Sequence, residues 1–370
     1  MKISQQKQFL LVEPVSKTPY PPLGLMKISS MLKEQNKRCH VFDIVGTNVP
    51  KGLSRVEAIY ITTLFTWDLD AAIRTIHFYS DNFPKVNLNV GGIAATLLPG
   101  DIEMQTGIRP HIGILKEAES FRPDYSLSFG RHINSSITFA SRGCVRKCKF
   151  CSVSKHEPQF FIKRNWERDI QPDLPYITFW DNNWLASPNL RVDCEKIYRI
   201  GKPVDFNQGL DARLYDIETA KELSMININP MRFAFDDVRM ENQIIKAIKL
   251  ANKYSGREIR VYVLYNFEDT PEDFYYRINL MNKMKVLTFP MEYRKTSASK
   301  RRFPGKYWNL PLLRALKLSL LFYYRRGMIT TSRRSLLSIY GKNPREFTEK
   351  LYQIFEYDKN LKSRKHPSSA

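Results

Sequence analysis

Residues 141–151 read Ser-Arg-Gly-Cys-Val-Arg-Lys-Cys-Lys-Phe-Cys, and this stretch decides the fold of the chain around it. It holds three of the five cysteines, Cys144, Cys148 and Cys151, in the spacing Cys-x-x-x-Cys-x-x-Cys. Three thiolates on one tight loop can bind three irons of a 4Fe–4S cluster and leave the fourth iron open for another ligand. The basic side chains of the loop favour thiolates and partly offset the negative cluster; they are Arg142, Arg146, Lys147 and Lys149.

A structural zinc ion is the main alternative for these cysteines, and it needs a fourth ligand. Cys39, Cys194 and His156 are able to supply one, and His156 is near in the sequence. Zinc sites usually combine two short Cys or His pairs, and the sequence has no second pair. The spacing therefore favours the cluster, and we expect Cys39 and Cys194 to be small buried hydrophobic residues.

The cysteine loop follows the first of a series of apolar strand patterns that alternate with helical patterns. The strand patterns lie at 137–140, 176–180, 204–207, 231–235, 259–265 and 286–291, with helical patterns at 217–225, 241–253 and 271–283. Six such units predict a partial (β/α)6 barrel over residues 137–292. In barrels of this type, functional groups lie at the C-terminal ends of the strands.

A shorter alternation precedes the barrel, over residues 1–115. Its strand patterns lie at 9–12, 41–44, 59–65 and 86–90, and its helical patterns at 23–37 and 68–79. The pattern predicts a shortened α/β domain of the Rossmann-like type, joined to the barrel by a polar linker at 116–136. The phosphate fingerprint Gly-x-Gly-x-x-Gly is absent, and we interpret Gly91-Gly92 as a tight turn where a side chain would collide.

These features resemble the radical S-adenosylmethionine (SAM) enzymes, in particular the branch with a cobalamin-binding-like domain before the radical SAM barrel. The resemblance covers about residues 9–292 and rests chiefly on the three-cysteine spacing, with an aromatic residue just before the last cysteine. Weaker signals in the matching order are Ser141-Arg142-Gly143, Pro21-Pro22-Leu23-Gly24-Leu25, Val90-Gly91-Gly92 and Pro123-Asp124-Tyr125-Ser126. The resemblance implies an enzyme that uses a 4Fe–4S cluster, SAM and an external one-electron donor of the flavodoxin or ferredoxin type.

The resemblance also implies roles for residues of this chain. Cys144, Cys148 and Cys151 would hold the cluster, SAM would bind its open iron, and Phe150 would lie against the adenine. Polar residues near the later strand ends are expected to contact SAM: Asp181, Asn182, Asn183, Asn207, Gln208, Arg213, Asp237 and Tyr265. Asp and Asn at such positions also serve as helix caps, and we expect this role for Asp216. The sequence does not indicate which residues act on the substrate.

Cobalamin is less clearly implied. Cobalamin proteins with a histidine lower ligand carry Asp-x-His-x-x-Gly, whereas Asp43 is followed here by Ile44-Val45-Gly46-Thr47-Asn48. Relatives without the histidine also hold cobalamin, so the sequence leaves this cofactor open and favours a degenerate scaffold. A cobalamin-dependent radical methyltransferase is therefore one alternative function.

The charge is concentrated at the C-terminal end. The chain has a net charge of +21, and residues 291–370 contain 19 Lys and Arg against 5 Asp and Glu, leaving 39 against 32 for the first 290 residues. Basic and aromatic residues interleave after the last strand, at Arg294-Lys295, Lys300-Arg301-Arg302, Phe303, Lys306, Tyr307 and Trp308. This pattern is typical of a nucleic-acid surface, and a basic loop over the barrel mouth is the plainer alternative. Residues 293–370 are expected to form a mainly helical extension.

No apolar run reaches the roughly 18 residues of a membrane span, and the N-terminus lacks the apolar stretch of a signal peptide. We therefore expect a cytoplasmic protein without membrane contact. Two classes of function remain. The first is a radical SAM enzyme acting on an unidentified substrate, with nucleic acid as one candidate. The second is a non-catalytic iron–sulfur protein that binds nucleic acid. Polar groups at the strand ends favour the enzyme. The sequence does not indicate the oligomeric state.

Overall fold

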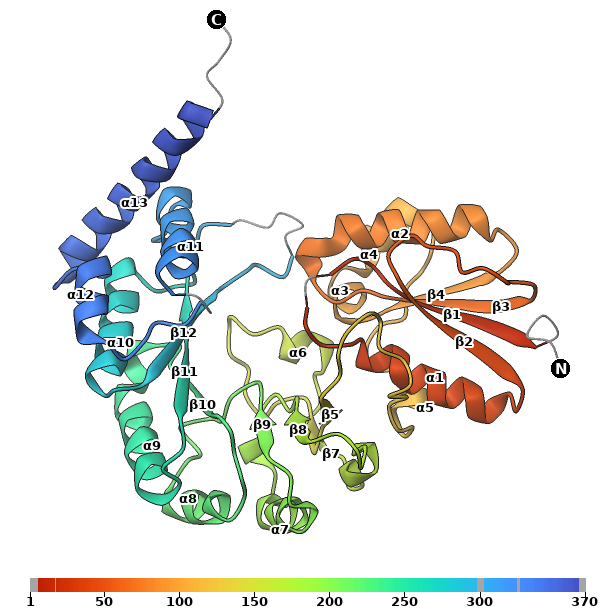
Figure 1. Ribbon diagram of the computed structural model, residues 1–370, viewed down its shortest axis with the longest axis horizontal. Coiled ribbons are helices and arrows are strands. Elements are labelled where there is room, and N and C mark those ends of the chain that lie inside the picture. The colour runs from red at the N-terminus through yellow and green to blue at the C-terminus, as the bar shows by residue number, and fades with distance from the viewer. Residues whose placement is uncertain (1–5, 17, 298–302, 325–326, 366–370) are drawn as a thin grey trace, which may run out of the picture. The chain divides into compact units, whose positions relative to one another are not determined.

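The computed structural model describes residues 6–16, 18–297, 303–324 and 327–365, which divide into two compact units (Figure 1). Unit 1 holds the described residues up to Asn182 and those at 296–297, and unit 2 holds those at 183–295 and from 303 onward. The predicted domain boundaries at 115, 136 and 292 stay predictions.

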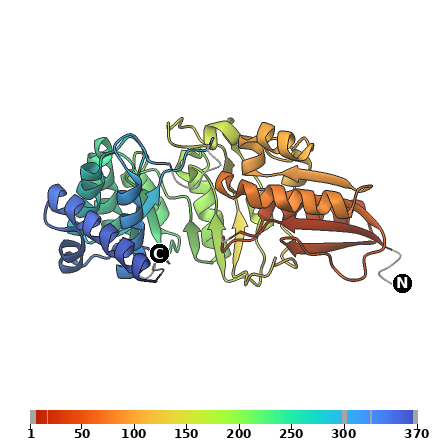
Figure 2. The ribbon, with the colours of Figure 1, turned by 90° about the horizontal axis from the view of Figure 1, so that it is seen from above.

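Unit 1 begins with a four-stranded parallel sheet in the order β2-β1-β3-β4. Its strands are β1 (Lys7–Glu13), β2 (Cys39–Val45), β3 (Val56–Thr62) and β4 (Asn87–Gly91), and its helices are α1 (Leu23–Gln35), α2 (Leu69–Asn82), α3 (Ile93–Leu97), α4 (Pro99–Thr106) and α5 (Lys116–Glu119). Helices cover both faces of the sheet (Figures 1 and 2). Alternate residues of β1 therefore belong to two different cores. Phe9 and Leu11 are in the same core as Met26 of α1. Leu10 is in the same core as Ile76 of α2.

The turn after β4 is as tight as the two glycines predict. Gly92 has a φ of +113°, and a Cβ atom at this position would lie 2.3 Å from the backbone oxygen of Thr63. Thr63 also accepts a hydrogen bond from the Ala95 backbone N–H through its hydroxyl, at 2.8 Å. The glycine is thus required by the close approach of two backbones.

Residues 116–136 are held against the first sheet rather than hanging free. Three contacts fix them: the Ser29 hydroxyl donates to Asp124 at 2.6 Å, the Phe129 N–H donates to Asp43 at 2.8 Å, and Arg131 donates to Glu13 at 2.6 Å. The polar composition of this segment therefore reflects hydrogen bonds to α1, β1 and β2.

Unit 1 contains two further pairs of strands, and the cysteine loop connects the strands of one pair. The parallel strands β5 (Ser135–Thr138) and β8 (Tyr176–Phe179) pair with each other, and the short antiparallel strands β6 (Ser141–Arg142) and β7 (Phe161–Ile162) close a hairpin. Helix α6 (Val153–His156) lies within this hairpin, and the 3₁₀ helix η3 (Trp166–Asp169) follows it. The predicted strand at 176–180 is confirmed as β8, the strand predicted at 137–140 lies two residues earlier as β5, and the hairpin is an addition.

Unit 2 contains the parallel sheet β10-β11-β12 and its flanking helices. In chain order its elements are η4 (Trp184–Ala186), α7 (Leu190–Ile200), β9 (Val204–Phe206), α8 (Ile217–Ser224), β10 (Met231–Ala234), η5 (Val238–Met240), α9 (Glu241–Tyr254), β11 (Ile259–Tyr265), α10 (Pro271–Lys283), β12 (Leu287–Glu292), α11 (Leu310–Tyr323), α12 (Arg333–Tyr340) and α13 (Pro344–Lys365). The backbone of Thr288 in β12 also exchanges two hydrogen bonds with Ile329 in an antiparallel bridge, at 3.0 and 2.7 Å.

The predicted fold class is confirmed, with alternating strands and helices, parallel sheets and a mainly helical C-terminal end. Among the helices built from described residues, none combines the length and the apolar composition that crossing a membrane requires.

Candidate functional site

The three clustered cysteines lie on the loop between β6 and α6. Cys144, Cys148 and Cys151 are half-buried and are not in disulfides. The Cys151 N–H donates to the Cys148 carbonyl at 3.0 Å, and the Arg146 N–H donates to Cys144 Sγ at 3.3 Å. This contact fixes the backbone two residues after Cys144 against its sulfur. Phe150, the predicted adenine contact, is half-buried on the same loop.

The described side chains do not converge on a single metal ion. Across the described ranges, no group of three or more His, Cys, Asp or Glu residues is placed to hold one. A structural zinc ion usually takes four protein ligands, whereas three cysteines suffice for a 4Fe–4S cluster with one open iron. The three thiols of this loop match the donor set of such a cluster. Of the other two cysteines, Cys194 is buried in α7 as expected, and Cys39 is half-buried in β2.

The start of the cysteine loop is fixed by backbone geometry. Gly143 has a φ of +72°, and a Cβ atom there would lie 2.1 Å from the backbone oxygen of Gln159. Glu157 accepts hydrogen bonds from Arg142 at 2.6 Å and from the Gly143 N–H at 2.8 Å. The residue directly before Cys144 is thus held on two sides. No motif or spacing in the sequence points to Glu157.

Asp181, a predicted SAM contact, holds the residues that lead into the loop. Its carboxylate accepts from the Ala140 N–H at 3.0 Å, and from the N–H and hydroxyl of Ser141 at 2.5 and 2.7 Å. Burial raises the pKa of Asp181 to about 7, and the hydrogen bonds from Ser141 oppose this shift only in part. These bonds give Asp181 a role in positioning the loop, and its contact with SAM stays a prediction.

The two asparagines after Asp181 differ in their surroundings. In unit 1, Asn182 is half-buried and donates to Glu157 at 3.1 Å. In unit 2, Asn183 is 3% exposed and donates to Asp211 at 3.2 Å. The side-chain oxygen of Asn183 is buried and has no hydrogen-bond partner among the described residues. A buried acceptor without a donor is costly, so this oxygen is suited to a donor of a bound ligand.

The turn after β9 contains three more predicted contacts. Asn207 is half-buried and Gln208 is exposed, and the Asn207 carbonyl accepts from the Tyr262 hydroxyl at 2.8 Å. Arg213 donates through two nitrogens to Asp211, at 2.6 and 3.0 Å. The fork of Arg213, which we expected to suit a carboxylate of SAM, thus pairs with a carboxylate of the chain itself.

The last two predicted contacts have local structural roles. Asp237 caps η5 by accepting from the Arg239 N–H at 2.8 Å, and its ion pair with Arg239 lowers its pKa. Tyr265 is 4% exposed, its ring packs near Phe274 and Trp308, and burial raises its pKa strongly. Their contact with SAM stays a prediction that these surroundings do not favour.

A buried arginine that the sequence analysis missed lies at the same strand ends. Arg277 is fully buried and donates to the carbonyls of Phe235 and Asp236 at 3.0 and 2.9 Å, and to the Asp269 carboxylate at 2.7 Å. The carboxyl of Asp236 lies in this region, where burial raises its pKa to about 6 and Arg277 partly opposes the shift. The signal available in the sequence was an arginine in the apolar stripe of α10, between Phe274 and Ile278.

The start of the basic C-terminal region is tied to the end of β11. Asn266 donates to the Phe303 carbonyl at 2.7 Å and accepts from the Gly305 N–H at 2.6 Å, and the Trp308 indole donates to the Asp269 carbonyl at 2.9 Å. Trp308 is 5% exposed, so it belongs to the core and is not a stacking platform for bases. Lys300, Arg301 and Arg302 lie outside the described residues.

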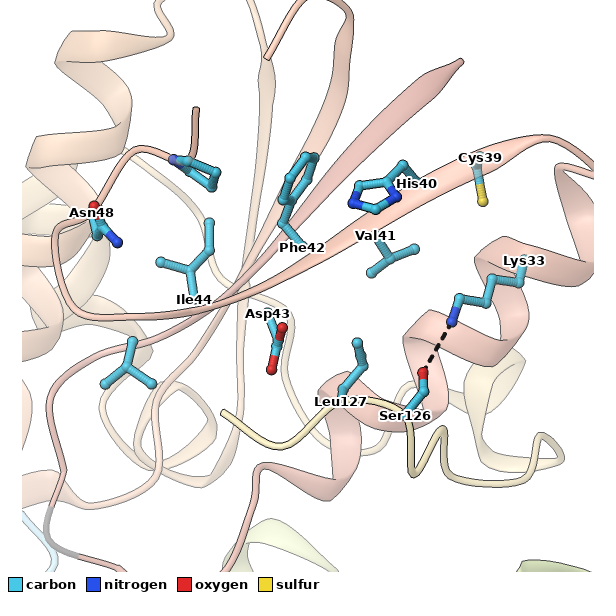
Figure 3. A pocket seen from close by; sticks show the side chains of 12 residues that line it. Lys33, Cys39, His40, Val41, Phe42, Asp43, Ile44, Asn48, Ser126 and Leu127 are labelled. Atoms are coloured by element: carbon cyan, nitrogen blue, oxygen red, sulfur yellow. Dashed lines mark hydrogen bonds between the residues drawn. The ribbon is translucent and has the colours of Figure 1, made fainter. Parts of the chain in front are cut away.

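A groove with a volume of about 530 Å³ runs along β2 (Figure 3). It is lined by β2 residues such as His40 and Phe42, by Asn48 in the following loop, and by Ser126 opposite them. The loop in which a cobalamin histidine would occur contributes Asn48 here, and its backbone is held by Tyr79, whose hydroxyl donates to the Asn48 carbonyl at 2.7 Å. None of the predicted site residues lines this groove.

The fold of this chain is similar to the folds of solved structures. The structure is similar to that of the radical SAM methyltransferase TsrM from Kitasatospora setae with cobalamin and a 4Fe–4S cluster bound, with a TM-score of 0.59 and 12% identity over 78% of this chain and 75% of that one. TsrM with tryptophan and the SAM analogue aza-SAM bound gives a TM-score of 0.60 and 12% identity, over 76% and 72% of the two chains. No family model and no curated protein sequence matches the chain.

The protein therefore has the fold of a radical SAM enzyme with a cobalamin-binding-like domain. The resemblance noted in the sequence is confirmed at the level of the fold.

Proposed function

We propose that this protein is a radical SAM enzyme in which Cys144, Cys148 and Cys151 hold a 4Fe–4S cluster with one open iron. The observation that supports this proposal is the position of the Cys-x-x-x-Cys-x-x-Cys loop, directly after the first barrel strand of a radical SAM fold. When bound there, a reduced cluster would pass one electron to the sulfonium of SAM, and cleavage of a carbon–sulfur bond would give methionine and a 5′-deoxyadenosyl radical able to abstract hydrogen from the substrate.

The protein's own residues would bind and orient SAM. Asn183 is the strongest candidate, because its buried side-chain oxygen lacks a donor among the described residues. Asn207 and Gln208 lie on an adjoining turn with side chains that are not fully buried. Asp181 and Arg213 already bond within the chain, so in this proposal they act mainly by holding neighbouring segments. An external flavodoxin or ferredoxin supplies the electron.

Anaerobic reconstitution tests the proposal. The loaded protein should bind about four irons, as the cluster type requires, and after reduction it should cleave SAM to 5′-deoxyadenosine. Cys148→Ala should abolish both signals, whereas Cys39→Ala, which changes a half-buried cysteine of β2, should leave the iron content unchanged. A fully loaded cluster that yields no 5′-deoxyadenosine would contradict hydrogen abstraction by a 5′-deoxyadenosyl radical. Deuterium transfer between the 5′-deoxyadenosyl group and another molecule would identify the substrate.

A cobalamin-dependent methyltransferase is the second candidate, and the likeness to TsrM, a methyltransferase with cobalamin bound, favours it. The residues after β2 do not fit a histidine-ligated cobalamin, because that loop has no histidine and its backbone is held by Tyr79. In this second proposal, cobalamin binds without a lower ligand from the protein. In the same reconstitution with cobalamin added, S-adenosylhomocysteine and a methylated product would indicate methyl transfer, and 5′-deoxyadenosine alone would indicate hydrogen abstraction.

A further inference from the structure

We propose that Glu157 is a positioning residue for the iron–sulfur cluster, which acts by holding the entry of the cysteine loop through both of its carboxylate oxygens. The inference rests on the proposed function, because it assigns Glu157 to the cluster that the three cysteines would hold. It concerns a residue that is not itself a cluster ligand and that the spacing of the cysteines does not reveal.

The contacts of Glu157 are divided between its two oxygens. One oxygen accepts from Arg142 at 2.6 Å, and the other accepts from the Gly143 N–H at 2.8 Å and from Asn182 at 3.1 Å. The side chains of Arg142 and Glu157 are only 11% and 9% exposed, so water screens the pair weakly. A single carboxylate thus joins the residue before Cys144 to the residues after β8.

Because Glu157 lies after the cysteine loop in the chain and Gly143 lies before it, the bond between them joins the two ends of the loop. Residue 157 follows α6, and α6 begins two residues after Cys151. The bond from the Gly143 N–H to Glu157 therefore closes a ring of chain that contains all three cysteines. Gly143 allows this closure because its backbone passes the Gln159 carbonyl at a distance that leaves no room for a side chain.

Arg142 also lies close to charged groups that contact α1, the first helix of unit 1. Its guanidinium carbon lies 3.9 Å from the centre of the Phe139 ring, and one of its nitrogens lies 4.0 Å from Glu119. Glu119 in turn pairs with the buried Lys27 of α1 at 3.3 Å. Buried charges are tolerated only when they are paired in well-defined geometry. The contact with the Phe139 ring and the hydrogen bond to Glu157 therefore restrain the Arg142 guanidinium, and Glu119 adds a weaker attraction at 4.0 Å.

This arrangement predicts an effect on the cluster that exceeds the effect on folding. Partners that orient metal ligands without binding the metal commonly change metal affinity by roughly 10- to 100-fold when they are removed. Loss of the Glu157 carboxylate frees the Gly143 N–H and the guanidinium of Arg142, and so loosens the backbone beside Cys144. Apart from Arg142 of β6, the hydrogen-bond partners named for this carboxylate lie outside helices and strands, so we expect a smaller effect on the folding of the cluster-free protein.

The test compares Glu157→Ala and Glu157→Gln with the full-length protein after anaerobic reconstitution. We expect Glu157→Ala to release iron to a chelator roughly tenfold faster than the unchanged protein, with an altered electron paramagnetic resonance spectrum of the reduced cluster. Glu157→Gln keeps one oxygen for the Gly143 N–H but loses the charge, so its release rate should be intermediate. The thermal unfolding midpoint of each cluster-free protein measures the structural cost.

Glu349→Ala serves as the matched control, because Glu349 forms an exposed ion pair with Arg345 on α13. It should change neither the iron release nor the spectrum. If the unchanged protein binds no cluster, the proposed function fails. If the unchanged protein loads normally and folded Glu157→Ala matches it in both readouts, only the inference about Glu157 fails. Should Glu157→Ala not fold, Glu157→Gln decides, and release and spectrum equal to those of the unchanged protein overturn the inference.

Discussion

At the scale of single residues, Asp181 combines burial with an unusual protonation equilibrium. Burial raises its pKa to about 7, because a carboxylate inside the protein loses its hydration. In the unfolded chain an aspartate has a pKa of about 3.9. The folded protein therefore keeps a proton on Asp181 that the unfolded chain releases. The stability contributed in this way is fully present below about pH 4 and is lost as the pH rises through 7.

Asp181→Asn should remove this pH dependence. Between pH 5 and 6 the unfolding free energy of the unchanged protein should fall, relative to the variant, by about 1.4 kcal/mol per pH unit, and this slope should halve near pH 7. Urea unfolding at a series of pH values measures the difference. Asp216→Asn is the control, since a backbone hydrogen bond from Thr219 lowers the pKa of Asp216 and its titration lies below this window. Equal pH slopes for Asp181→Asn and the unchanged protein would contradict the assignment.

Residue roles were predictable where the contact is local in sequence. Asp216 caps α8 as expected, by accepting from Thr219 three residues later at 2.8 Å. The contacts named for Glu157 and Arg277 join residues 8 to 42 positions apart, and no spacing rule describes them. Half of their partners are backbone groups, which leave no mark in the sequence. The sequence predicted that Asp181 lies at a strand end, but it did not indicate that the side chain is buried.

At the scale of elements, the turn between β4 and α3 depends on a glycine. Gly92→Ala would place a Cβ atom against Thr63 in a backbone conformation that alanine rarely adopts, so it should destabilise the fold by more than about 1 kcal/mol. Gly100→Ala is the matched control, because Gly100 lies in α4 with open space around its Cβ position. Alanine favours helices, so that variant should be neutral or up to about 1 kcal/mol more stable. Thermal unfolding of both variants measures the contrast, and equal midpoints would contradict it.

The elements that the sequence predicted share a strong apolar pattern. β1 and β11 are continuous or alternating apolar runs, and α9 and α10 have clear helical periodicity. The hairpin of β6 and β7 escaped prediction, because its strands have two residues each and are defined by pairing across the cysteine loop. The order of the motifs, rather than any single pattern, made the fold recognisable.

At the scale of the whole molecule, the basic C-terminal region keeps two exposed pairings of lysine with an aromatic ring. Lys295 lies 5.2 Å from the centre of the Phe303 ring, and Lys306 lies 5.0 Å from that of Tyr307. Both rings are more than 40% exposed, unlike that of Trp308. These two pairs lie in the described part of the region for which the sequence predicts a nucleic-acid surface.

A variant with Lys295→Gln and Lys306→Gln tests that surface without removing the backbone that Asn266 holds. If each lysine meets a phosphate, the slope of log affinity against log salt concentration for single-stranded RNA should fall by about 1.4 in magnitude. Lys249→Gln with Lys253→Gln, two exposed lysines of α9, removes the same charge elsewhere and should leave the slope unchanged. Slopes that are the same for both double variants would contradict a nucleic-acid role for these residues and favour a loop that only covers the strand ends.

The antiparallel bridge between Thr288 and Ile329 has a consequence for solubility. β12 is the last strand of its parallel sheet, and an open strand edge invites pairing with another molecule. The two hydrogen bonds to Ile329 occupy part of that edge with a later segment of the same chain. Shortened versions of the protein that end before residue 329 would expose it, so a fragment of unit 2 has to extend past residue 329 to keep this edge paired.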